Sequence, residues 1–185
     1  VRVGTISAIG GNALAGNANG GNGGSVSLDA GGATPTITHQ TVTTTGGNRI
    51  GSGTAGTGGD ISVADASLLS AATTIAAGGG SAGTGTGGHV TFGNTVDSSG
   101  SNRTLAVNTN GITTFTGAVG ETFALTSLAT DAPGSVRVGG SVTTTGVQTY
   151  NDPLTLLAHS TMTGTTPTFG STLTGGGFDL TLNFS

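Results

Sequence analysis

The segment GTGGDISV (residues 56–63) combines the two features that decide the fold, a glycine-rich start and apolar side chains at alternate positions. GNGGSVSL (21–28) and GTGGHVTF (85–92) have the same form. The last glycines of the three segments are Gly24, Gly59 and Gly88, which are 35 and 29 residues apart. Unequal spacing is typical of a solenoid, because a loop can lengthen at a corner without disturbing the stacked strands. We therefore predict glycine corners that each lead into a stacked strand.

Short alternating runs continue along the whole chain, as in TLAVN (104–108), SVRV (135–138) and LTLNF (180–184). A period of two with β-branched residues indicates strands, and no stretch shows the spacing of an amphipathic helix. The predicted fold class is all-β, with a right-handed parallel β-helix (β-solenoid) as the architecture, because parallel crossovers are right-handed by default. Repeat lengths usual for solenoids give about eight coils of roughly 20–25 residues.

Inward side chains should stack in a narrow apolar column. The predicted core residues are Val26, Leu28, Ile61, Val63, Val90, Phe92, Leu105, Val107, Leu180 and Leu182. Two further segments, 91–108 and 168–183, both begin with Thr-Phe-Gly and end in Asn. We predict that Asn108 and Asn183 end equivalent strands, where their amides either form a ladder along the axis or simply tolerate a corner conformation.

Composition excludes several classes of function. The chain has 38 Gly, four Arg, no Lys, eight acidic residues and no Cys. Without Cys there is neither a disulfide framework nor a thiolate metal site. Net charge of −4 argues against binding nucleic acid, which needs a basic surface, and against docking on anionic lipid. No apolar run approaches the ~20 residues that cross a bilayer. We expect no nucleic acid partner and no membrane insertion.

Candidate catalytic and metal-binding residues are few. His39, His89 and His159 are widely separated, which favours scattered histidines over a metal site. Asp60 and Asp65 are the only close acidic pair, and their odd spacing directs them to opposite faces of one strand. A glycosidase instead needs carboxyl groups that converge. We therefore expect no catalytic residue, no cofactor and no enzyme activity.

Calcium-binding β-helix repeats need an acidic ligand in every coil. The corresponding positions after the three glycine segments are Ser25, Asp60 and His89. Two of these side chains cannot supply a carboxylate, so we expect no calcium site.

The second half of the chain resembles the shaft repeats of large bacterial exoproteins, of the filamentous haemagglutinin and autotransporter adhesin type. The resemblance lies in TTTGVQTYNDPLTLLAHSTMTGTTPTFGSTLTGGGFDLTLN (143–183), with its Gly-x-Gln-Thr-Tyr-Asn segment (146–151) and Thr-Met-Thr-Gly step (161–164), and TNGITTFTGAVG (109–120) is similar. It covers the regular repeats of residues 89–185, whereas the Gly-rich coils of residues 1–88 match only in style. The family's Asn-Pro-Asn-Gly export motif is not matched by Asn108-Thr-Asn-Gly111, which we interpret as a corner.

The resemblance implies that residues 1–185 are a single segment of a longer repeat protein, secreted or held on the bacterial cell surface. Such fibres hold adhesive regions away from the cell, so the implied partner is a glycan or protein on a host or neighbouring cell. One alternative is a subunit that self-associates end to end into an extracellular filament. Another is an ice-binding solenoid, since TVTTT (41–45), SVTTT (141–145) and TMTGTT (161–166) supply Thr-x-Thr units.

Overall fold

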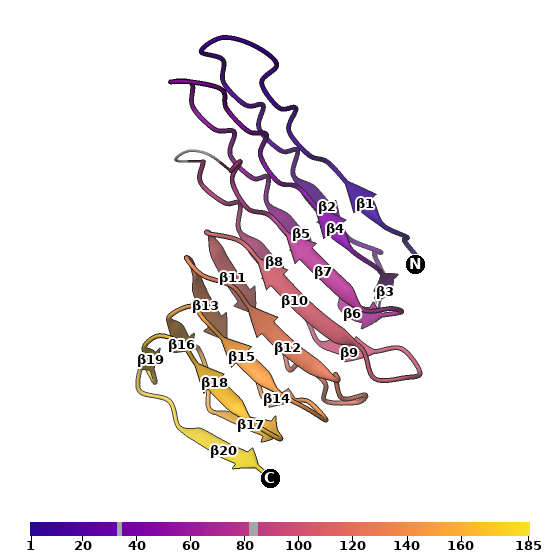
Figure 1. The fold of residues 1–185 in the computed structure, drawn as a ribbon. Helices are drawn as coiled ribbons and strands as arrows, with labels where there is room; N and C mark the ends of the chain where they lie inside the picture. The colour runs from indigo at the N-terminus through magenta and orange to yellow at the C-terminus, as the bar shows by residue number, and fades with distance from the viewer. Residues whose placement is uncertain (33–34, 82–84) are drawn as a thin grey trace.

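The computed structural model describes residues 1–32, 35–81 and 85–185 (Figure 1). Within these residues the chain forms 20 short strands and no helix. All strand pairs between these elements are parallel. The protein is therefore all-β with parallel sheets, as the alternating runs predicted.

Two of the sheets have seven strands each. The first face contains, in order, β1 (Ile6–Ser7), β4 (Val42–Thr43), β7 (Thr73–Ala76), β10 (Thr104–Asn108), β12 (Ser127–Thr130), β15 (Gln148–Tyr150) and β18 (Pro167–Phe169). The second face contains β2 (Val26–Leu28), β5 (Ile61–Val63), β8 (Val90–Phe92), β11 (Ile112–Phe115), β13 (Ser135–Val138), β16 (Leu154–Leu156) and β19 (Leu173–Thr174).

The third face consists of two three-stranded sheets. One contains β3 (Thr36–His39), β6 (Ala66–Leu69) and β9 (Val96–Ser98), and the other contains β14 (Val142–Thr143), β17 (Ser160–Gly164) and β20 (Leu180–Phe184). Val119 forms parallel bridges with both Val96 and Val142, so it connects the two sheets. We use the word level for one passage of the chain through the three faces. The described residues form seven levels.

The levels become shorter along the chain. Residues hydrogen-bonded between adjacent levels are 35 positions apart at Ser25–Asp60, 29 at Asp60–His89, 23 at His89–Ile112 and 20 at His159–Asp179. The first levels therefore use more residues than the expected roughly 20–25, and seven levels form instead of eight.

The three glycine segments do lead into equivalent strands. Val26 pairs with Ile61, which pairs with Val90, and Leu28, Val63 and Phe92 align in the same way. Six of the predicted core residues are fully buried, namely Ile61, Val63, Val90, Phe92, Leu105 and Val107. Val26, Leu28 and Leu180 are partly buried against this core.

Leu182 is the exception, since it is 48% exposed. It aligns with the fully buried Met162, but β20 is at the outer edge of its sheet and only β17 pairs with it. An inward side chain needs a level on both sides to lose its contact with water, and the pattern of the sequence alone did not show this.

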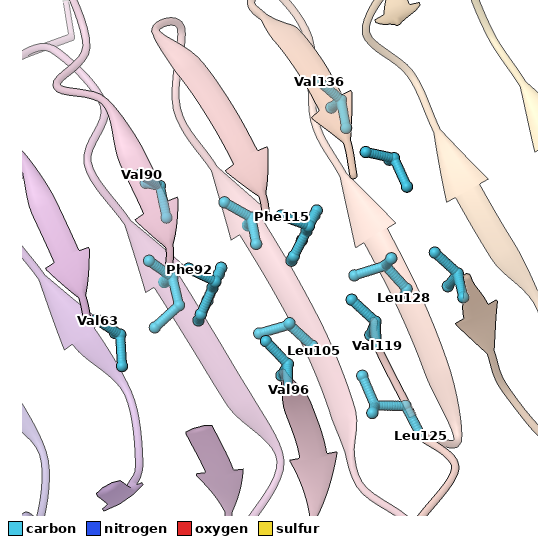
Figure 2. Close-up of a cluster of buried hydrophobic side chains, with 14 of the residues drawn as sticks. Val63, Val90, Phe92, Val96, Leu105, Phe115, Val119, Leu125, Leu128 and Val136 are labelled. Carbon is cyan, nitrogen blue, oxygen red and sulfur yellow. The ribbon is translucent and has the colours of Figure 1, made fainter. Parts of the chain in front are cut away.

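The apolar core runs between the three faces. Figure 2 shows side chains from different faces directed toward one another, among them Leu105 and Leu128 from the first face, Phe92 and Phe115 from the second, and Val119 from the third. The rings of Phe92 and Phe115 stack with centroids 5.2 Å apart, and those of Tyr150 and Phe169 stack at 5.6 Å. Fully burying one such apolar side chain stabilises the fold by about 1.5–3 kcal/mol.

The extra length of the first three levels is an excursion between the first and second faces, here called the glycine extension (residues 8–24, 44–59, 77–81 and 85–88). In Figure 1 the chain runs out beyond the strands at the top of the view and returns. The outgoing and returning limbs are joined by Gly24 N to Ala8 O (2.7 Å), Gly59 N to Thr44 O (2.7 Å) and Gly88 N to Ala77 O (2.7 Å). Adjacent levels are joined as well, for example by Gly80 N to Gly56 O (2.9 Å).

Close backbone approach explains the glycines of this extension. Gly53, Gly56 and Gly59 recur at every third position, the period of a polyproline II helix. A β-carbon on Gly56 would lie 1.9 Å from Gly21 O, and one on Gly59 would lie 2.4 Å from Gly24 O. None of the three has a positive φ. The prediction of sharp glycine corners is therefore wrong. The glycine segments are extended limbs whose backbones pack without side chains between them.

We expect Gly56→Ala to be destabilising, because its methyl group must displace the backbone at Gly21 in the level before. Overpacking of this kind costs about 1–3 kcal/mol or more, which lowers Tm by several degrees in a chain of this size. Gly78→Ala is the matched control, since a β-carbon there meets nothing within 4 Å. Thermal unfolding followed by circular dichroism compares them, and equal Tm values would contradict the close-packed extension.

Candidate functional site

The most unusual polar cluster lies where the first face turns into the second. Thr109 follows β10, Asp131 follows β12 and Asp152 lies between β15 and β16, so the three occupy this corner in successive levels. Asp131 Oδ1 accepts a hydrogen bond from Thr109 N at 2.8 Å. The corner thus carries two acidic side chains in adjacent levels.

Asp152 is the buried member of this pair, with only 2% of its surface exposed. Its Oδ1 atom has no hydrogen-bond partner among the described residues. Gly134 lies close to this carboxyl group. A β-carbon on Gly134 would lie 3.1 Å from Asp152 Oδ1, 2.7 Å from Thr109 O and 2.8 Å from Gly111 O. The carboxyl group is therefore buried beside the backbone of Gly134, where water does not solvate its ionised form.

The electrostatic consequence is a raised pKa at both acids. Burial, and then the negative charge of Asp131, raises the pKa of Asp152 to about 6, and the Thr130 side chain offsets this in part. Burial also raises the pKa of Asp131, whereas the hydrogen bond from Thr109 N lowers it. A carboxyl group with such a pKa beside a second one is the pattern of acid–base catalysts. At 2% exposure, however, Asp152 is not open to a large substrate, and we expect the pair to affect folding stability instead.

Sequence reasoning missed this pair because it compared only acids close along the chain. A signal was present, since Asp131-Ala-Pro and Asn151-Asp152-Pro each follow a strand of the first face. The pair that the sequence did suggest is separated in the structure. Asp60 Oδ1 accepts from His89 N in the level after it (2.7 Å), and Asp65 Oδ2 accepts from Ala30 N in the level before it (2.5 Å).

The three histidines lie in different places and each has its own partners. His39 is buried in β3, where its Nδ1–H donates to Gln40 O (3.0 Å) and Ser67 Oγ donates to its Nε2 (2.6 Å). Burial lowers the pKa of His39, and the bond to Gln40 offsets this in part. His159 Nδ1 accepts from Asp179 N (3.1 Å). Among the residues that the structure describes, no three His, Cys, Asp or Glu side chains gather as metal ligands.

Ser25, Asp60 and His89 form a column along the second face. Asp60 N donates to Ser25 Oγ (3.1 Å), His89 N donates to Asp60 Oδ1 (2.7 Å), and Ile112 N donates to His89 Nδ1 (3.0 Å). Although the residue types are those of a catalytic triad, the histidine ring bonds backbone and Asp60 lies between the other two. A triad needs the histidine in contact with both partners. The column therefore connects levels and has no geometry for nucleophilic catalysis.

One outward column of the second face consists of hydroxyl side chains and one arginine. In order along the face, its members are Ser27, Ser62, Thr91, Thr114, Arg137, Thr155 and Thr174. Arg137 interrupts the column, and the neighbouring outward positions include Asp60, His89 and Ile112. The second face therefore has no two parallel columns of Thr, whereas the Thr-x-Thr units of the ice-binding alternative lie on the first face (β4) and the third face (β14 and β17).

Asn108 and Asn183 do not occupy equivalent strands, which corrects the prediction. Asn108 is on the first face and pairs with Ala76, whereas Asn183 is on the third face and pairs with Thr163. The two Thr-Phe-Gly segments begin on different faces as well, in β8 and in β18. Their similar sequences therefore reflect similar strands and turns, and the two amides form no ladder with each other.

No family model, curated protein or solved structure matches this chain. In the described part of the chain there is no helix long and apolar enough to cross a membrane.

We expect Asp152→Asn to change how stability depends on pH. Because the pKa of Asp152 is higher folded than unfolded, its stabilising effect is complete below about pH 4 and is lost as the pH rises to about 6. The variant should match the wild type at about pH 4 and have a free energy of unfolding roughly 2 kcal/mol higher at about pH 7.5.

Urea unfolding at both pH values measures this difference. His39 has the opposite pH dependence, but it contributes equally to both proteins. Asp29→Asn is the control, since the exposed Asp29 accepts a hydrogen bond from Gly31 N and an amide oxygen can replace the carboxylate oxygen there. A gain in stability that is the same at both pH values would show that Asp152 does not titrate in this range.

Proposed function

We propose that this chain is a shaft segment of a large secreted or cell-surface bacterial adhesin, folded as a right-handed parallel β-solenoid. The observation that carries the proposal is the continuity of the structure across seven levels. Parallel ladders connect successive levels on each face, and one apolar core of buried residues runs along them. The resemblance of residues 89–185 to adhesin shaft repeats supplies the biological setting.

The physical role of such a segment is mechanical. Each level is bonded to its neighbours through backbone N–H and C=O groups, so a pull along the axis is shared by many hydrogen bonds. Each of these contributes about 0.5–1.5 kcal/mol net. The ladders and the core give stiffness without a disulfide, as suits a chain without Cys outside the cell. In this proposal the adhesive contact is with a glycan or protein of a host or neighbouring cell.

End-to-end self-association into a filament is the second candidate. Exposed apolar side chains at the last level, Leu173, Phe178 and Leu182, favour it. The outlines of the two end levels differ, however, because the first level includes the glycine extension and the last does not. A copy stacked head to tail would leave this extension uncovered, so we favour the shaft.

We expect Val107→Asp to make the segment sensitive to protease, because it places an unpaired charge in a fully buried site. The cost is several kcal/mol, comparable with the stability of a whole domain. Thr114→Asp is the control, since Thr114 points outward beside Arg137 in the next level. Limited proteolysis compares the two, and equal sensitivity would contradict the inward and outward assignment.

The shaft role itself is tested by display on a bacterial surface. The chain is inserted between an outer-membrane anchor and a known binding domain, on cells that carry a thick surface polysaccharide. We expect cells with the wild-type segment to attach to the domain's ligand, and cells with the Val107→Asp segment or without a segment to attach less. Equal attachment of all three would overturn the spacer role, and attachment to cultured cells by beads coated with the chain alone would assign adhesion to the segment itself.

A further inference from the structure

Asn110 closes the glycine extension where it ends. The residue lies in the fourth level, which has no extension, and its side chain contacts both limbs of the third. Asn110 Oδ1 accepts from Gly79 N on the outgoing limb (3.1 Å), and Asn110 Nδ2 donates to Gly85 O on the returning limb (3.0 Å). The amide satisfies a donor and an acceptor at once, which neither a carboxylate nor an ammonium group can do.

The next residue is Gly111, and Asn followed by Gly is chemically labile. Without a β-carbon, the glycine nitrogen can approach the preceding side chain more closely than that of any other residue. In the fold this nitrogen is held elsewhere, because Gly111 N donates to Thr109 Oγ1 at 3.0 Å. Thr109 is itself 1% exposed, and its hydroxyl donates to Gly88 O at 2.6 Å. Ring closure at Asn110 therefore needs the bonds to Gly79, Gly85 and Thr109 to break together.

We propose that Asn110 is a latent deamidation site: the intact amide seals the glycine extension, and opening of the extension allows a reaction that prevents it from closing again. Gly111 N attacks Asn110 Cγ and forms a C–N bond, while the side-chain nitrogen leaves as ammonia with the proton of Gly111 N. Water then adds to the resulting cyclic imide and opens it to aspartate or isoaspartate. The only co-reactant is water, which reaches the exposed Asn110.

Either product weakens the seal. Aspartate still accepts from Gly79 N, but it has no N–H for Gly85 O and places a carboxylate oxygen against that carbonyl oxygen. Isoaspartate adds a backbone atom just before β11, where Thr113 must align with Val90 and Phe115 with Phe92. Because side chains alternate along a strand, a shift there misplaces the core residues of β11.

Two other Asn-Gly pairs provide an internal comparison in the first level. Asn22 Oδ1 accepts from Thr57 N (2.9 Å), and Gly23 N donates to Thr57 O (2.8 Å). Asn19 and Gly20 make the same pair of bonds with Thr54. Neither pair depends on Thr109, so a change at Thr109 should affect Asn110 alone.

Peptide mapping of the protein after incubation at mildly alkaline pH tests the site. We expect deamidation at Asn110 to be at least about tenfold slower in the folded chain than in urea, because reaction requires local opening. Thr109→Val should accelerate it at Asn110 and leave Asn19 and Asn22 unchanged. Equal rates in the folded and the denatured chain, or equal acceleration at all three sites, would overturn the proposal.

A second measurement tests the seal without relying on the Thr109 variant. Asn110→Asp imitates the product, and Asn94→Asp is the control because exposed Asn94 only accepts from Thr95 N. Hydrogen exchange at Gly58 N and Gly88 N reports on the returning limb, since these donate to Thr86 O and Ala77 O. We expect about tenfold faster exchange in Asn110→Asp than in the control. Unchanged exchange would show that Asn110 does not hold the extension closed.

Discussion

The backbone hydrogen bonds between successive levels are the interaction on which the rest of the structure depends. They hold neighbouring strands about 4.8 Å apart, so each paired strand residue lies over its counterpart in the level before. Each column of side chains must therefore fit that spacing. Val, Leu, Ile and Phe do so inside, hydroxyl side chains do so on the outer second face, and glycine does so where two limbs of backbone meet.

This constraint is met in two ways, by the limbs of the glycine extension and by the apolar core. In the glycine extension, backbone packs on backbone and hydrogen bonds must offset the large conformational entropy that glycine loses on folding. In the later levels the extension is absent while the apolar core continues, and the separation of hydrogen-bonded residues falls from 35 to 20. Thr109 and Asn110 lie at the transition, where their side chains bond the last glycine limbs. The change from Gly-rich coils to regular repeats near residue 89 therefore coincides with the end of the glycine extension.

The corner with Asp131 and Asp152 is the place where local chemistry and the fold conflict. The corner position that holds the neutral Thr109 in the fourth level holds the buried carboxyl group of Asp152 two levels later. Burial there costs free energy unless the carboxyl group binds a proton. Natural sequences keep few such conflicts, and for this reason we expect the stability of the fold to depend on pH at this corner.

The sequence by itself determined the all-β class, the alignment of Val26, Ile61 and Val90, and most inward positions, because strand alternation and repeat spacing are local properties. Only the tertiary structure decided which repeats share a face, since unequal loops change the register. It placed Asn108 and Asn183 on different faces and left Leu182 exposed at an edge. It also brought Asp131 beside Asp152 and turned the glycine segments into packed limbs. Contacts between levels depend on the length of every intervening loop, and that length has no signature within any single segment.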